Sequence, residues 1–141
     1  MSNRVRMAMA GVAGVASAFL VIAAIELVAH AVYAPSVMPD VSTPEAMAAY
    51  IASMPLGAFL FVLAAYVAGT AVGGFVGIAI ARRHAMRFAC LAGGMILLGA
   101  IAVFVRMPHP TWFVVATLVD IPLVAWLTGR AGRAWTPEAG V

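Results

Sequence analysis

Four long apolar segments limit what this chain can fold into more than any other feature of its sequence. They cover about residues 7–32, 55–81, 88–105 and 111–128. Each is near the roughly 20 residues that a helix needs to cross the hydrocarbon core of a bilayer. Within hydrocarbon a backbone must satisfy its own hydrogen bonds, which an α-helix does inside one segment. The sequence therefore predicts an all-α, polytopic membrane protein with four transmembrane helices.

Composition agrees with this prediction and excludes an ordinary soluble domain. Charged residues make up 9% of the 141 residues and hydrophobic residues 65%, whereas about a quarter of a soluble domain is charged. The chain is too short for two sizeable domains, so residues 1–141 are expected to form a single membrane domain. Cys90 is the only cysteine in the sequence, which excludes an intrachain disulfide, a CxxC redox pair and a thiolate metal cluster.

Short polar turns separate the later segments. The turns at residues 82–84 and 107–110 contain arginine, histidine and proline. Because both turns are short, the helices that they join are expected to be antiparallel neighbours. Gly129 and Gly132 are expected to end the last helix, since glycine favours helix ends. We therefore predict an antiparallel four-helix bundle.

The longest connection, residues 33–54, contains the signals for one further helix. Ser42 and Glu45 have the spacing of a capping box, and Pro44 falls in the first turn, where proline is tolerated. Apolar side chains then recur at intervals of three and four, which predicts a short amphipathic helix at about residues 44–53. We expect this helix to lie flat on the outer face of the membrane that the spans cross, or to cap the bundle there.

The positions of the arginines predict the orientation in the membrane. Only Arg106 falls on the same side as Asp40 and Glu45. The other arginines fall on the opposite side: Arg4, Arg6, Arg82, Arg83, Arg87, Arg130 and Arg133. Because cytoplasmic loops carry the excess of positive charge, both termini are expected to be cytoplasmic, and the charge is not read as a nucleic-acid patch.

The cellular setting follows from the same residue usage. The chain uses arginine and no lysine and is rich in alanine, which indicates a GC-rich bacterial genome and hence a bacterial inner membrane. The first apolar segment is longer than the core of a signal peptide and contains Glu26, so we expect it to be retained as a membrane span.

A stripe of glycine lies within the second segment. Gly69, Gly73 and Gly77 are spaced by four and share one helix face. Such a stripe lets another backbone approach closely. Its partner is either another helix of the same bundle or a second copy of the chain, so a homo-oligomer is an alternative to packing within one molecule.

Ionisable side chains within the apolar segments are the candidate functional residues. A charge near the bilayer centre costs at least ~2.5–3.5 kcal/mol, so such residues usually face the protein interior and have partners. Glu26 and His30 are four residues apart and share a face near the outer end of the first helix. His109 is expected at the same level, and Arg106 one turn down from its loop.

A second polar pair is expected deeper in the membrane. Asp120 and Tyr66 have similar predicted depths, and the Tyr66 hydroxyl is a candidate partner for the Asp120 carboxyl. Pro122 follows Asp120 and frees a backbone carbonyl one turn back, which is a feature both of binding sites and of structural kinks.

Three interpretations fit these residues. The preferred one is a non-enzymatic, outward-facing polar pocket that binds or transports a small polar solute, an ion or a proton. The first alternative is an accessory or structural subunit, in which Arg106 pairs with Glu26 or Asp120. The second is a membrane-embedded metal-binding protein or metalloenzyme with a site of Glu26, His30 and His109, because imidazole and carboxylate suit zinc or iron. No cofactor is strongly implied, and the sequence has no nucleotide-binding loop.

Overall fold

The computed structural model describes residues 2–35, 37 and 39–136, which form five helices and no strand. The helices are α1 (Asn3–Tyr33), α2 (Pro44–Ser53), α3 (Leu56–Ala81), α4 (Ala85–Arg106) and α5 (Thr111–Trp135). All of them except α2 are long and apolar enough to cross a membrane. The predictions of an all-helical protein and of four candidate membrane spans are confirmed.

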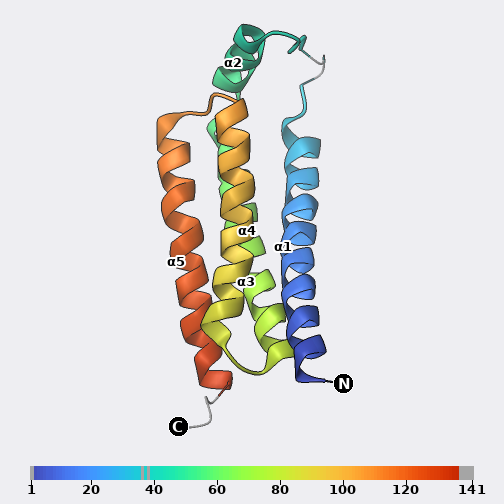
Figure 1. The fold of residues 1–141 in the computed structure, drawn as a ribbon. Coiled ribbons are helices and arrows are strands. Elements are labelled where there is room, and N and C mark those ends of the chain that lie inside the picture. Colours follow the sequence, from blue (N-terminus) through green and yellow to red (C-terminus); the bar gives the residue numbers. More distant parts are fainter. Residues whose placement is uncertain (1, 36, 38, 137–141) are drawn as a thin grey trace.

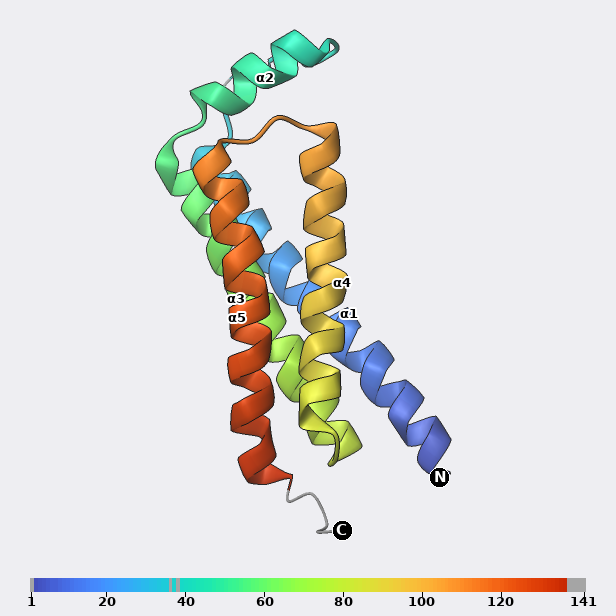
Figure 2. The same ribbon diagram turned by 60° about the vertical axis from the view of Figure 1, so that its left-hand side comes forward.

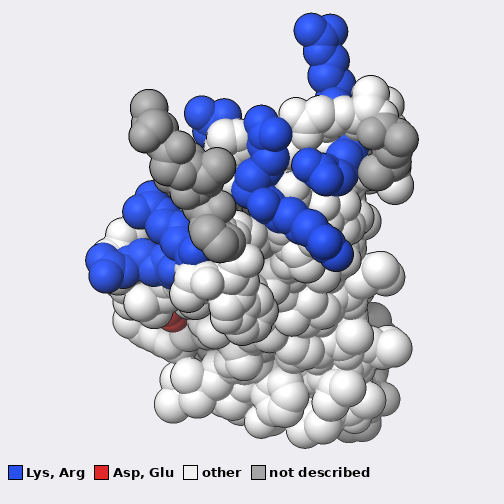
Figure 3. Space-filling model, turned by 90° about the horizontal axis from the view of Figure 1, so that it is seen from below, with Lys and Arg blue, Asp and Glu red and all other residues white. Residues whose placement is uncertain are grey.

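The four long helices lie side by side, and α2 lies across one end of the group (Figure 1). The N-terminus, the turn between α3 and α4, and the C-terminal end of α5 lie at the opposite end (Figures 1 and 2). Arginine side chains gather on that end of the molecule, as Figure 3 shows. We call it the arginine end, and we call the end that carries α2 the loop end.

The most extensive contact between two helices joins α1 and α3. It depends on glycine in both helices. A Cβ atom at Gly73 would lie 2.6 Å from the backbone oxygen of Gly14 and 2.6 Å from the Cβ of Ala18. A Cβ atom at Gly14 would lie 2.7 Å from the backbone oxygen of Gly73. The two backbones can approach this closely only because neither residue has a side chain.

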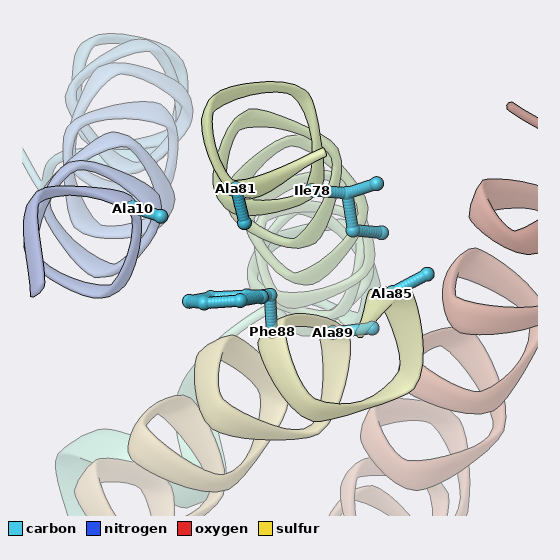
Figure 4. Close-up of a cluster of buried hydrophobic side chains, with 6 residues drawn as sticks. All are labelled: Ala10, Ile78, Ala81, Ala85, Phe88 and Ala89. Carbon is cyan, nitrogen blue, oxygen red and sulfur yellow. The ribbon is translucent and has the colours of Figure 1, made fainter. Parts of the chain in front are cut away.

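Buried apolar side chains form three clusters along the length of the molecule. The cluster at the arginine end is mainly alanine and combines side chains of α1, α3 and α4; in Figure 4 its Phe88 points toward α1, whereas Ile78 points toward α5. The central cluster combines alanine with Ile22, Ile96 and Ile121. The cluster at the loop end consists of Ile51, Phe59 and Phe113. The last of these is the one to which α2 contributes.

The helix α5 extends further than the sequence predicts. Gly129 and Gly132 lie inside it, and it ends at Trp135. A Cβ atom at Gly129 would lie 2.7 Å from the Sδ of Met86, and a Cβ atom at Gly132 would lie 2.6 Å from the Cδ1 of Ile78. The prediction that these glycines end the helix is wrong, because they serve the close approach of α5 to α4 and α3.

The start of α2 also differs from the predicted capping box. Thr43 is the N-cap, and its Oγ1 accepts a hydrogen bond from the backbone N–H of Ala46 at 3.1 Å. The backbone N–H of Ser42 donates to the Oδ1 of Asp40 at 3.0 Å. Hydrogen bonds from the side chain and the backbone of Ser42 lower the pKa of Asp40 below its ordinary value. Ser42 therefore stabilises the loop before the helix rather than the helix start.

Candidate functional site

A cavity of about 370 Å³ lies beneath α2. The backbone of α2 does not approach the long helices closely. The buried side chain of Ile51 connects α2 to Phe59 of α3 and Phe113 of α5. The space around this contact is bounded by α2, by the parts of α3 and α5 at the loop end and by the turn between α4 and α5. We call it the apolar cavity.

Three side chains with polar atoms line the apolar cavity: Tyr50, Tyr66 and His109. The rest of the lining is apolar or aromatic: Val41, Met47, Ile51, Met54, Ala58, Phe59, Val62, Met107 and Phe113. The cavity can therefore enclose an apolar group and offer it a small number of hydrogen bonds, which is the usual composition of a small-molecule site.

The ring of His109 is held in place by neighbours on two sides. It stacks on Phe113 with ring centroids 5.6 Å apart, and it meets Phe104 edge-on at 5.1 Å. Its Nδ1 lies 2.8 Å from the backbone oxygen of Met107. Because a carbonyl oxygen only accepts, Nδ1 carries the hydrogen of this bond, and in the neutral ring Nε2 is left to accept one.

A second cavity, of about 210 Å³, lies beside the first between α1, α2 and α3. Its polar side chains are Glu26, His30, Tyr33 and Tyr50. The Tyr33 hydroxyl lies directly over Gly57, in the space that a Cβ atom would occupy, so the end of α1 is seated against the start of α3. We call this space the acidic cavity, because the carboxylate of Glu26 lines it.

The two cavities have a common boundary. Tyr50 and Met54 of the α2 region and Ala58 and Val62 of α3 line both. A ligand that occupied both cavities would place its apolar part beneath α2 and its polar part beside Glu26.

The structure divides the six predicted site residues instead of collecting them. Glu26 and His30 line the acidic cavity, whereas Tyr66 and His109 line the apolar cavity. Asp120 is half-buried on α5 and is absent from the lining of both. Arg106 is the last residue of α4, and its exposed side chain lines neither cavity. Neither of these two cavities is lined by all six residues.

The polar pairs that the sequence offered as candidates are not formed between the described residues. Among the residues that the structure describes, Arg106 makes no ion pair with Glu26 or Asp120, and Tyr66 makes no hydrogen bond with Asp120. In the same part of the chain, no three side chains of histidine, cysteine, aspartate or glutamate are grouped so as to hold a metal ion. His109 comes from the turn after α4 and lies in a different cavity from Glu26 and His30.

The glycine stripe is buried inside the molecule. Gly69 and Gly73 face Ile22, Ala18 and Gly14 of α1, and Gly77 faces Phe88 of α4 as well as α1. A Cβ atom at Gly69 would lie 2.7 Å from Ile22. These contacts leave the three glycines no exposed face, so a second copy of the chain would need another surface.

Sequence reasoning missed most of the residues that bound the cavities. Phe59 and Phe113 look like ordinary apolar residues of their spans, and Tyr50 looks like one residue of an amphipathic face. One local signal was present, because His109 and Phe113 are four residues apart across the start of α5. The contact of Phe59 with Phe113, 5.2 Å between ring centroids, joins residues far apart in the sequence and has no local signal.

No family model matches this sequence, and no curated protein or solved structure shows significant similarity to it.

Proposed function

We propose that this protein binds a small amphipathic cation at the loop end of a membrane-embedded, antiparallel helix bundle. The observation that carries the proposal is the pair of adjoining cavities, one apolar and one lined by Glu26, which share Tyr50 and Met54. The protein acts by binding and, where the ligand can leave on the other side, by moving it across the membrane.

The size and lining of the apolar cavity support a ligand with an apolar body. Its volume of about 370 Å³ is within the range of roughly 300–1,000 Å³ that small-molecule sites occupy. Methionine side chains at three positions of its wall adapt their shape to different apolar partners. Tyr66 and His109 supply the hydrogen bonds that would orient such a body.

The charge of the acidic cavity supports a ligand with a positive group. Glu26 makes no ion pair within the described ranges of the chain, although it lies about 10 Å from the end of α1 on a membrane-spanning helix. An ionised carboxylate at such depth usually has a partner. The rings of Tyr33 and Tyr50 line the same cavity, and aromatic faces attract cations.

The proposed setting follows the positive-inside distribution. Placing the arginine end in the cytoplasm of a bacterial cell puts both termini there and opens the cavities beneath α2 to the outside of the inner membrane. In this arrangement α2 is an amphipathic helix at the outer surface, and the ligand enters from the aqueous or interfacial side.

Binding of two ions with the same shape and opposite charge tests the proposal. The purified protein is placed in phosphatidylcholine nanodiscs, and equilibrium binding of tetraphenylphosphonium and tetraphenylborate is measured. We expect the phosphonium ion to bind more tightly. Glu26→Gln is expected to weaken its binding about tenfold, because a carboxylate a few ångströms from a cation contributes on the order of 1–4 kcal/mol.

Two further variants separate the roles of charge and space. Glu45→Gln removes an exposed carboxylate of α2 that lines neither cavity, and it should leave both affinities unchanged. Val62→Phe fills the boundary between the cavities and should weaken the binding of both ions. Equal affinity of the unmodified protein for the two ions, or equal effects of the two glutamate substitutions, contradicts the proposal.

A second candidate function rests on the charges that lack a partner. Glu26 and Arg106 belong to different helices near the loop end and do not pair with each other. An accessory subunit would satisfy them with charges of another chain. Analytical ultracentrifugation of the protein extracted from its source membrane in mild detergent tests this function. A complex that dissociates in the Glu26→Gln and Arg106→Gln double variant favours it over ligand binding.

A further inference from the structure

A long apolar groove lies between α1 and α4 in the half of the molecule nearer the arginine end. Its volume is about 640 Å³, and every side chain that lines it is apolar. The contact between α1 and α4 is the least extensive of the five helix contacts. Figure 2 shows α1 diverging from α4 toward the N-terminus, which opens this space.

Small residues on α1 give the groove its depth. Ala8, Gly11 and Ala16 lie along its α1 side, and Phe88, Leu91 and Met95 form its α4 side. A Cβ atom at Gly11 would lie 3.2 Å from the Cδ2 of Leu91, so the floor of the groove is a close contact between the helices. The groove is closed on the inner side by this contact and is open on the outer surface of the helices.

The length of the groove matches one leaflet of a bilayer. Its α1 side runs from Met7 to Ala16, which is roughly 14 Å at the rise of an α-helix. Half of a hydrocarbon core of ~30 Å is about 15 Å. A single extended acyl chain therefore reaches along the groove when its headgroup lies at the level of the arginine end.

Two exposed arginines lie where that headgroup would be. Arg4 precedes Ala8 by four residues and Gly11 by seven, so it shares the α1 face that lines the groove. Arg87 precedes Leu91 by four residues on α4. Side chains in a helix lean toward its N-terminus, and both helices begin at the arginine end (Figure 2). Both guanidinium groups are thereby directed toward that end.

The local charge selects the headgroup. The first turns of α1 and α4 contain no acidic residue. Arg6, the neighbour of Arg4, already donates a hydrogen bond to the Oδ1 of Asn3 at 3.3 Å. Arg4 and Arg87 form no ion pair with a described residue, and guanidinium groups bind phosphate with paired hydrogen bonds.

We infer that the groove is a binding site for one anionic phospholipid, with an acyl chain between α1 and α4 and its phosphate headgroup at Arg4 and Arg87. This site is independent of the apolar and acidic cavities, because the groove lies nearer the other end of the molecule and shares no residue with either of them. The bound lipid fills the space beside the least extensive of the five helix contacts.

Native mass spectrometry of the full chain with defined lipids tests this inference. The detergent-purified protein receives equal amounts of phosphatidylglycerol and phosphatidylcholine of the same chain length. We expect one phosphatidylglycerol molecule to remain bound in preference to phosphatidylcholine. The Arg4→Gln and Arg87→Gln double variant should bind phosphatidylglycerol about 30-fold more weakly, because each arginine near an anionic surface strengthens binding about fivefold.

Two matched variants show whether the groove itself is the site. Arg130→Gln with Arg133→Gln removes the same charge from α5, at the same end of the molecule but outside the groove, and should keep the preference for phosphatidylglycerol. Ala16→Phe fills the groove and should weaken the binding of both lipids at least about fivefold. Ala102→Phe, at an exposed site of α4, should leave the binding of both lipids unchanged. Equal loss in the two arginine variants, unchanged binding in Ala16→Phe, or a lipid-free dimer that occupies the groove overturns the inference.

Discussion

Gly73 lies in the middle of α3 and has ordinary helical backbone, so its backbone conformation does not require glycine. The short distance between α1 and α3 does require it. The missing side chain of Gly73 leaves room for the backbone of Gly14 and for Ala18. Gly94 in α4 is the opposite case, because no atom lies within 4 Å of the position that its Cβ would take. Identical residue types in neighbouring helices therefore have different effects on stability.

Substitution of these two glycines by alanine separates the effects. Gly73→Ala is expected to lower the free energy of unfolding by about 1–3 kcal/mol, because rigid backbone and a Cβ atom must move apart. Gly94→Ala is expected to raise it by up to about 1 kcal/mol through helix propensity. Unfolding in mixed micelles of detergent and dodecyl sulfate measures both. Equal effects would show that the α1–α3 contact is looser than described.

Two threonine hydroxyls in the core have no hydrogen-bond partner among the described residues: those of Thr70 and Thr117. Both side chains are fully buried. A buried hydroxyl without a partner costs about 1–3 kcal/mol, whereas an apolar group of the same shape does not. Ser17 differs, because its Oγ donates to the backbone oxygen of Ala13 at 2.7 Å.

Replacement of Thr117 by valine tests this cost. Thr117→Val keeps the shape of the side chain, and we expect it to raise the free energy of unfolding by about 1 kcal/mol or more. Ser17→Ala, which removes a bonded hydroxyl, is expected to give no such gain. A loss of stability in Thr117→Val would show that its hydroxyl has a partner in the membrane.

At the level of single elements, α2 is the part of the fold with the fewest attachments. Its backbone is distant from the long helices, and Ile51 is its one buried side chain. The N-cap bond of Thr43 stabilises the helix itself but not its position. The place of α2, and with it the shape of the apolar cavity, depends on the contact of Ile51 with Phe59 and Phe113.

Truncation of Ile51 should release α2 from the other helices. Ile51→Ala removes most of a buried side chain, which costs about 2–5 kcal/mol in a packed core. We expect faster hydrogen–deuterium exchange of residues 44–53 and little change in α4. Ala49→Ser alters an exposed position of the same helix and should leave the exchange unchanged. Protection that survives in Ile51→Ala would mean that other contacts hold α2.

The loop before α2 should respond to acid. The pKa of Asp40 is lower in the folded loop than in an unfolded chain, because Ser42 donates hydrogen bonds to its carboxylate. This contribution to loop stability is present above the ordinary pKa of aspartate and is lost as the pH falls through the lower, folded pKa. In an NMR titration, Ser42→Ala should move the pKa of Asp40 back up toward its ordinary value; an unchanged pKa would contradict this assignment.

Considered as a whole, the molecule separates its charges between its two ends. The N-terminal turn of α1, the turn at residues 82–84 and the last turns of α5 carry arginine. The opposite end carries Asp40, Glu45 and the two cavities, and of the described arginines only Arg106 lies there. This polarity favours an orientation with the arginine end in the cytoplasm.

Labelling with a membrane-impermeant maleimide tests this orientation in intact cells. In a Cys90→Ser background, Glu45→Cys is expected to react from the outside, whereas Arg83→Cys is expected to react only after the membrane is permeabilised. Both positions are exposed, so differences in burial do not explain a difference in labelling. The reverse pattern would invert the proposed topology.

Hydropathy and the positions of turn residues were sufficient to predict the helical class and the four candidate spans. These properties are sums over consecutive residues, so each span is visible without knowledge of its neighbours. The same local reasoning failed at Gly129 and Gly132, because a glycine that ends a helix and one that packs against Met86 or Ile78 look alike in a sequence.

The arrangement of the polar residues could not be obtained in this way. Membrane depth predicted which side chains lie at similar levels, but not which way each helix turns its faces. Packing of α1 on α3 directs Glu26 toward one cavity, and the turn before α5 places His109 in the other. Arg106 and Asp120 lie outside both, since rotation of a helix about its axis is set by contacts with other helices and not by the depth of its residues in the membrane.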